Sequence, residues 1–209
     1  MKKLKVWADA GGSNPRTDWD NLGTMVCFHN RYDLGDKNHG YSMVDYDSWY
    51  ELEKAITKEN NVAVILPIYM YDHSGITIST GQFNCSFDSG QIGFIYITKE
   101  KVLSEYGGKI VTKALKERIE KYLEGEVKTY DQYLTGDVYG FTVLEGREMV
   151  TLSREDFEKG NCDNVEEEIE WEEVDSCGGF YGSDFQTNGM KCYLDEELHE
   201  QLLTVEVEY

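Results

Sequence analysis

The sequence has little of what marks a membrane-spanning or secreted protein. No apolar run approaches the roughly 18 residues that a membrane helix needs. The N-terminus, MKKLKVWADAGG, has only a broken apolar run after its lysines. The sequence therefore predicts neither a membrane span nor a signal peptide.

Cysteine pairs and catalytic signatures are also missing. The 5 cysteines are an odd number, widely scattered and without a CxxC pair, which predicts reduced thiols and a cytoplasmic location. Cys27 and Cys85 lie inside apolar, strand-like runs, so core packing is the favoured explanation for both. No phosphate-binding glycine loop, nucleophile elbow or kinase signature is present, which favours a binding role over catalysis.

The residues that are present predict one folded α+β domain with a mostly antiparallel sheet and two to four helices. Hydrophobic residues make up 40% of the chain and aromatic residues 13%, enough apolar surface to offset the entropy of ordering. We expect this domain to comprise residues 1–145 and 174–209, with residues 146–173 as an acidic insertion between two strands that pair as a hairpin.

Hydrophobic periodicity and turn residues place the individual elements. The predicted strands are 2–9, 22–29, 62–71, 76–80, 92–98, 138–144, 174–181 and 204–209. The predicted helices are 47–61, 98–107, 109–125 and 194–203. Residues 126–134 resemble a further strand, although a helical extension through Tyr130 is the alternative.

The formal charge of −20 is unevenly distributed. Residues 1–144 carry 20 acidic and 16 basic residues, whereas residues 145–209 carry 20 acidic and 4 basic residues. The densest segment is Asp163–Asp175, in which 8 of 13 residues are acidic and none is basic. Such a local excess of negative charge indicates that this part of the surface has a requirement of its own, different from that of residues 1–144.

If the acidic segment is a strand, its alternate side chains share one face. Carboxylates on that face recur about every 6.6 Å, twice the strand rise of about 3.3 Å. This is of the order of the charge spacing on a nucleic acid strand, one per roughly 3.4 Å of rise. The same-face acids are Glu166, Glu168, Glu170 and Glu172, whereas Val165, Ile169 and Trp171 lie mainly on the other face.

The interleaved apolar residues indicate an ordered segment, and the alternative is a solvated acidic face that only aids solubility. A partner-binding role would involve eight residues: Glu166, Glu167, Glu168, Glu170, Trp171, Glu172, Glu173 and Asp175.

Two loops offer an alternative, enzyme-like reading. Asp72 and His73 follow an apolar strand, and Asp88 and Gln91 lie where a neighbouring loop returns, which predicts a carboxylate–histidine site as the alternative. A turn is the competing explanation, because sequence neighbours cannot fill the roles of a triad. Weak candidates for a divalent metal are His29, Asp33, Asp36 and His39, whose spacing matches no metal signature. We expect no cofactor.

Several strings resemble an uncharacterised phage- and prophage-encoded protein family of Gram-positive bacteria. They are DNLGTMVCFHNRYDLGD (20–36), LPIYMYDHSGITIST (66–80), FDSGQIGFIYITKEK (87–101), YDQYLTGDVYGF (130–141) and DSCGGFYG (175–182). In the related pattern a short acidic turn joins the last two strands, so the long 146–173 segment is a departure. The resemblance implies the context of small, acidic phage proteins that inhibit host defence, some of them by mimicking DNA.

These observations together predict an inhibitor of a host nucleic-acid-targeting complex, of the anti-CRISPR or antirestriction type, acting in the host bacterial cytosol. Its acidic, DNA-mimicking patch would bind a basic host protein, with no direct contact to nucleic acid or membrane. The alternative is a metal-dependent hydrolase or nucleotide-binding protein that uses the His/Asp loops.

Overall fold

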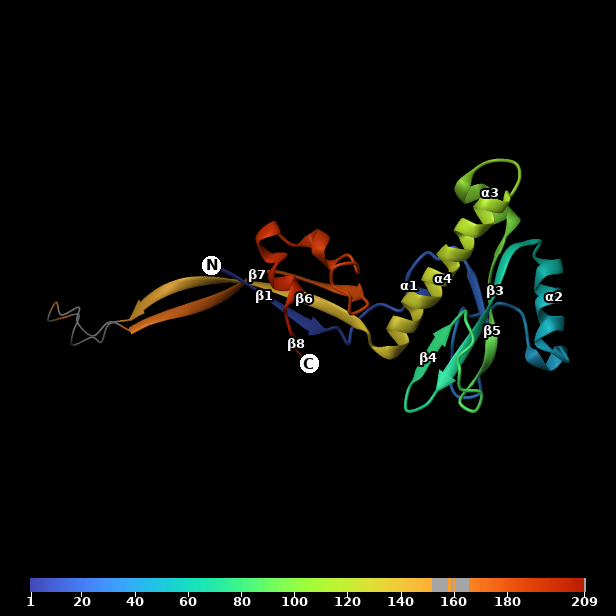
Figure 1. Cartoon of the computed structure of the whole chain (residues 1–209), viewed down its shortest axis with the longest axis horizontal. Helices are drawn as coiled ribbons and strands as arrows, with labels where there is room; N and C mark the ends of the chain where they lie inside the picture. The colour runs from blue at the N-terminus through green and yellow to red at the C-terminus, as the bar shows by residue number, and fades with distance from the viewer. Residues whose placement is uncertain (152–157, 159, 161–165, 209) are drawn as a thin grey trace. The chain divides into compact units, whose positions relative to one another are not determined.

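A computed structural model of the chain describes residues 1–151, 158, 160 and 166–208 (Figure 1). The chain divides into two compact units, where the sequence predicted one domain. We call Ser13–Thr135 the helical unit, and Met1–Gly12 together with Gly136–Tyr209 the arm unit. The physical reason for the division is that each unit has its own four-stranded sheet with its own hydrophobic core.

The sheet of the helical unit is entirely antiparallel, in the order β2-β5-β3-β4. The sequence placed these strands to within a few residues, because apolar runs rich in Val, Ile and Tyr form them. Their bounds are β2 (Thr24–Cys27), β3 (Val62–Asp72), β4 (Ile76–Ser79) and β5 (Ser89–Thr98).

Helices cover both faces of this sheet. One face packs on Leu52 and Ile56 of α2, and the other packs on α3 and α4 (Figure 1). Predicted caps begin two helices, since the side chains of Ser48 and Thr98 accept hydrogen bonds at the starts of α2 and α3. The helical elements are α1 (Pro15–Asp18), the 3₁₀ turn η1 (Met43–Asp45), α2 (Trp49–Glu59), α3 (Lys99–Tyr106) and α4 (Lys113–Thr135).

Helix α4 corrects the prediction of a strand after Gly125. It runs on to Thr135, because buried residues continue at helical spacing through the segment. Gly136 follows with a φ of 74°, the left-handed conformation that commonly ends a helix. The buried residues of α4 are Ile119, Leu123, Val127 and Tyr130.

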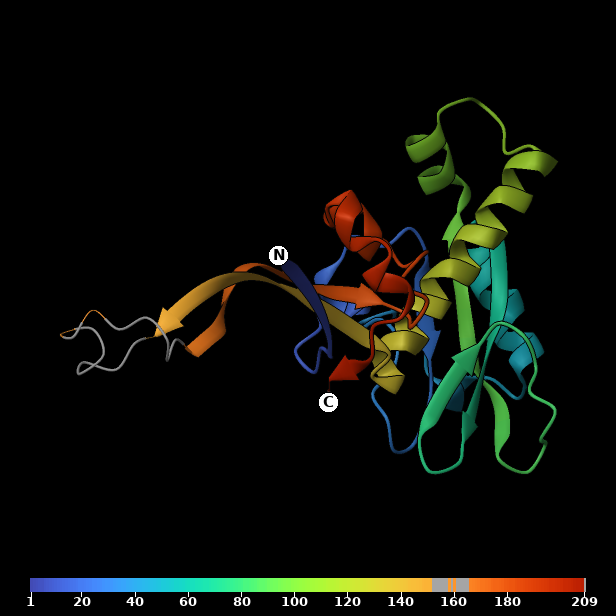
Figure 2. The same cartoon turned by 60° about the vertical axis from the view of Figure 1, so that its left-hand side comes forward.

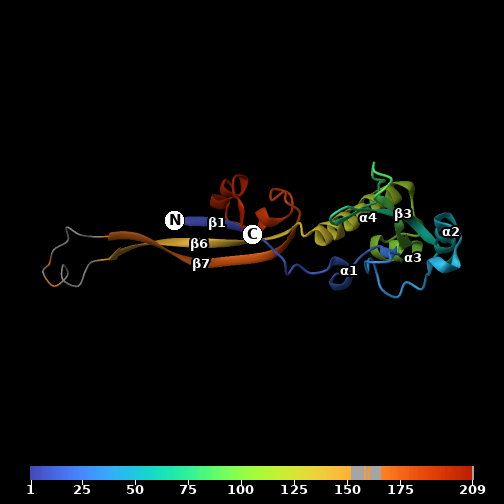
Figure 3. The ribbon, with the colours of Figure 1, turned by 90° about the horizontal axis from the view of Figure 1, so that it is seen from below.

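The arm unit is built on a sheet of order β7-β6-β1-β8, in which only β1 and β8 are parallel. Three 3₁₀ turns cover one face of it (Figure 3). The strands are β1 (Lys2–Ala8), β6 (Val138–Thr151), β7 (Glu166–Tyr181) and β8 (Val207–Glu208), and the turns are η2 (Met190–Tyr193), η3 (Glu196–Leu198) and η4 (Gln201–Leu203). Their shared core includes Leu4, Val6, Phe141, Val143, Phe180, Met190, Leu194, Leu198 and Leu202.

The predicted hairpin of residues 138–144 and 174–181 is present, but its strands are longer than expected. The described ends of the 146–173 segment continue β6 and β7, so they extend the hairpin. Residues 152–157, 159 and 161–165 of that segment lie outside the described residues. Residues 194–203, predicted as a helix, form the two 3₁₀ turns η3 and η4 instead. Of the predicted strand 204–209, only β8 is present among the described residues. The α+β class and the mainly antiparallel pairing are confirmed.

Candidate functional site

Residues 166–172 of the predicted acidic segment lie in the part of the hairpin that β1 does not reach. Pairing between β1 and β6 ends where Lys2 faces Glu145, whereas β6 and β7 stay paired as far as Thr151 and Glu166. We call residues 146–151 and 166–172 the acidic arm. It is a two-stranded ribbon that runs on past β1 (Figures 1 and 2).

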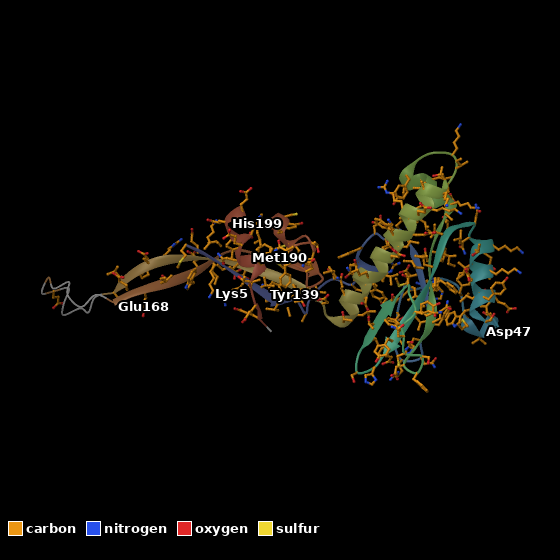
Figure 4. All side chains as sticks on the ribbon, in the orientation of Figure 1. Lys5, Asp47, Tyr139, Glu168, Met190 and His199 are labelled. Carbon is orange, nitrogen blue, oxygen red and sulfur yellow. The ribbon has the colours of Figure 1, made fainter. Side chains whose placement is uncertain are left out.

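One face of the acidic arm carries the alternating glutamates. Residues that oppose each other in an antiparallel pair point to the same face. Glu168 opposes Met149, Glu170 opposes Arg147, and Figure 4 shows Glu168 on this ribbon. The one-to-one register from Glu166 to Glu172 confirms that this segment is a strand, as the spacing argument requires.

These glutamates have little positive charge near them. Arg147 Nη2 lies 2.8 Å from Glu172 Oε2, with both side chains more than half exposed. Within the described part of the chain, no ion pair reaches Glu168 or Glu170. Glu172 also opposes Glu145, a like-charge pairing that costs stability. The arm therefore presents uncompensated negative charge to solvent.

The other face of the acidic arm is partly apolar. The side chains of Ile169 and Trp171 pack over Gly146, where an added Cβ atom would lie 2.9 Å from Ile169 Cγ2 and 3.1 Å from the Trp171 ring. Lys3 Nζ lies 5.9 Å from the Trp171 ring centroid, within range of a cation–π interaction. Trp171 nevertheless stays 37% exposed and Ile169 45% exposed, so the face has apolar area left to bury.

Two further residues of the predicted partner-binding set, Glu173 and Asp175, lie at the base of the acidic arm. Glu173 opposes Leu144 and Asp175 opposes Val143, and the intervening Val174 is an extra residue that forms a β-bulge. All three are exposed. Glu167 opposes Val150 on the apolar face, so it borders the apolar residues.

The alternative polar site is partly assembled in the helical unit. Asp72 N donates to Asp88 O at 2.8 Å, and His73 Nδ1 lies 3.5 Å from Asp88 Oδ2. Asp72 itself is paired with Arg31, which the sequence reasoning did not include. Gln91 is not part of this group, because its side-chain amide donates to Gly93 O at 3.3 Å.

The arrangement around Asp88 lacks the order that nucleophilic catalysis needs. Cys85 Sγ lies 3.7 Å from Asp88 Oδ2, so the carboxylate is between the thiol and the imidazole of His73. A catalytic triad requires the imidazole in the middle. Because His73 is also 65% exposed, the contacts are those of a solvated loop junction.

The four weak metal candidates are each engaged with different partners. His29 stacks on Tyr32 with ring centroids 5.0 Å apart. Asp33 pairs with Lys37, and the His39 ring accepts a hydrogen bond from Tyr41 N. Burial lowers the pKa of His39, with nearby Asp36 acting in the opposite direction. No group of three or more His, Cys, Asp or Glu side chains arranged to hold a metal ion occurs among the described residues.

Asp36 belongs to a buried ion network that the sequence did not reveal. Its carboxylate accepts two hydrogen bonds from Arg16, at 2.8 and 2.7 Å, and Glu126 accepts a third at 3.0 Å. The same carboxylates accept from backbone N–H groups of β2 and the loop before it. Burial alone lowers the pKa of Arg16, but hydrogen bonds and charge from Asp36 and Glu126 leave it raised. We assign this network to stability.

No protein-family model, curated protein or solved structure matches the chain. Among the described residues, no helix is both long and apolar enough to cross a membrane.

Proposed function

We propose that the protein binds a basic, nucleic-acid-targeting host protein through the acidic arm, and that it acts in the bacterial cytosol as an inhibitor of a defence complex. The observation that carries this proposal is the row of exposed glutamates on one face of the ribbon, with Arg147 as its one basic residue in the described part of the chain. A basic nucleic-acid groove is complementary to such a row in charge.

The spacing of the row supports mimicry of a nucleic acid. Same-face residues of β7 recur about every 6.6 Å along the ribbon, comparable to a regularly charged strand. The strand backbone fixes this spacing, so binding does not have to order the charges first. The resemblance to phage-encoded proteins supplies the context of an inhibitor, by analogy alone.

The test is a pulldown from host lysate at low and high salt, with wild-type protein and two charge-matched variants. The arm variant replaces Glu166, Glu168, Glu170 and Glu172 by Gln. The control variant replaces four exposed glutamates of α3 and α4 by Gln, namely Glu105, Glu117, Glu120 and Glu124.

We expect wild type and the control variant to retain the same nucleic-acid-binding proteins at low salt. High salt, competing duplex DNA and the arm substitutions should each release them, because all three remove the charge interaction. Retention of the same proteins by the arm variant, or indifference to salt and DNA, would overturn the proposal.

A further inference from the structure

The outer edge of β7 has no neighbouring strand among the described residues. β7 is the outermost strand in the order β7-β6-β1-β8, so its backbone is paired on one side only. Edge strands present unpaired N–H and C=O groups that a further extended segment can use.

One hydrogen bond identifies which backbone groups of β7 point outward. Gly146 N donates to Met1 O at 2.8 Å, so the backbone groups of Gly146 point toward β1 and away from β7. Gly146 and Trp171 therefore form a non-hydrogen-bonded pair, and the N–H and C=O of Trp171 face outward. By alternation the same holds for Ile169 and Glu167, whereas Glu168 and Glu170 bond to β6.

The side chains along this edge alternate in chemistry as well as in direction. Ile169 and Trp171 lie on the apolar face, and Glu168 and Glu170 lie on the acidic face. An added strand would place its own alternate residues beside these two rows. Basic residues would suit one row and apolar residues the other.

A second copy of this chain is a poor occupant of the edge. It would bring its own glutamates beside those of β7, and like charges on neighbouring strands are destabilising. The charge on the edge thus disfavours self-association and favours a basic strand.

We propose that the outer edge of β7, from Glu167 to Trp171, takes up an extended partner segment in which lysine or arginine alternates with apolar residues. This inference rests on the proposed function, because it specifies how the basic partner meets the acidic arm. Backbone hydrogen bonds from Ile169 and Trp171 supply the added strand pairing, and the two side-chain rows select the sequence.

The probe is a short synthetic peptide in which lysine and valine alternate, compared with an isomeric peptide that has the lysines and valines in two blocks. The exchange rates of the individual β7 amides, measured by NMR, report directly on whether the edge is paired. Without peptide, the amides of Ile169 and Trp171 should exchange faster than those of Glu168 and Glu170, which bond to β6. The alternating peptide should slow the exchange of Ile169 and Trp171, and the block peptide should not.

A matched pair of variants isolates the backbone contribution. Ile169→Pro removes an outward N–H, which an edge strand tolerates, and Ile169→Ala keeps that N–H while removing most of the side chain. We expect the alternating peptide to bind Ile169→Pro about fivefold to tenfold more weakly than Ile169→Ala, the effect of about one hydrogen bond. Unchanged protection of Glu168 and Glu170 in Ile169→Pro would show that the ribbon is intact.

The outcomes separate this inference from the function it rests on. Equal binding of the two peptides, or Ile169 and Trp171 amides that stay unprotected in wild type when the alternating peptide is present, would overturn strand addition even if the arm variant loses its host partners. The proposed function would instead be overturned if the arm variant retained the host partners. Protection of the two outward amides by the alternating peptide alone supports strand addition.

Discussion

The helical unit carries 18 acidic and 13 basic residues, whereas the arm unit carries 22 acidic and 7 basic residues. The two units also place their acids differently. Glu126 of the helical unit is 10% exposed and accepts hydrogen bonds from Arg16 and from backbone N–H groups. Glu168 and Glu170 of the arm are exposed and form no ion pair in the described chain, although Arg147 opposes Glu170 across the strands. Acids of the first kind serve the fold, and those of the second kind remain available for a partner.

The largest expected effect comes from removing the cation of the buried network. Arg16→Ala leaves Asp36 and Glu126 with an uncompensated charge, which should lower the free energy of unfolding by about 3–5 kcal/mol. The control is Arg147→Ala in the arm, where an exposed pair should contribute about 0–1 kcal/mol. Urea unfolding measures both, followed by the helical circular-dichroism signal for Arg16→Ala and by the β-sheet signal of the arm unit for Arg147→Ala. Equal effects would contradict the distinction between the two kinds of acid.

A smaller effect should separate two glycines, one from each unit. A Cβ atom on Gly140 of β6 would lie 2.3 Å from the indole of Trp7, whose Nε1 donates to Thr142 at 3.2 Å. Gly140→Ala should therefore cost about 1–3 kcal/mol through overpacking. Gly125→Ala, inside α4 with open space at the Cβ position, should instead stabilise by about 0.5–1 kcal/mol. Chemical denaturation of both variants decides this, and a stabilising Gly140→Ala would refute the contact.

The smallest effect concerns pH and the core of the helical unit. Burial raises the pKa of the Cys27 thiol to about 12. An unfolded thiol has a pKa of about 8.5, so the folded state keeps a proton that the unfolded state loses above that pH. Stability should be fully retained below about pH 8.5 and fall by roughly 1–2 kcal/mol between there and pH 10. Cys27→Ala should lack this part of the decline, and an identical decline in the variant would contradict it.

Local patterns predicted much of the helical unit. Strands β3 and β5 followed from apolar runs, and α2 followed from a capping serine and apolar residues at helical spacing. For residues 126–134 a strand was preferred, and the extension of α4 through Tyr130 was the alternative. The burial of Val127 and Tyr130 shows that helical spacing was the stronger signal.

Contacts between residues far apart in the chain, and the order of the strands, could not be predicted from the sequence. Arg16, Asp36 and Glu126 are far apart in the chain, and only the fold brings them together, so Asp36 was taken for a metal candidate. The alternation of Glu168 and Ile169 on a strand was predictable, but which edge of that strand is open depends on the order of the sheet. The partner-binding role itself stays a prediction.

The pairing of β1 with β6 has a consequence for the order of folding. Lys2 pairs with Glu145, so the whole helical unit is synthesised between two neighbouring strands of one sheet. The contiguous unit can fold as soon as its own chain has left the ribosome, whereas β1 must wait for β6. We expect the proposed binding edge of β7 to form only after the helical unit, because β6 and β7 follow that unit in the chain.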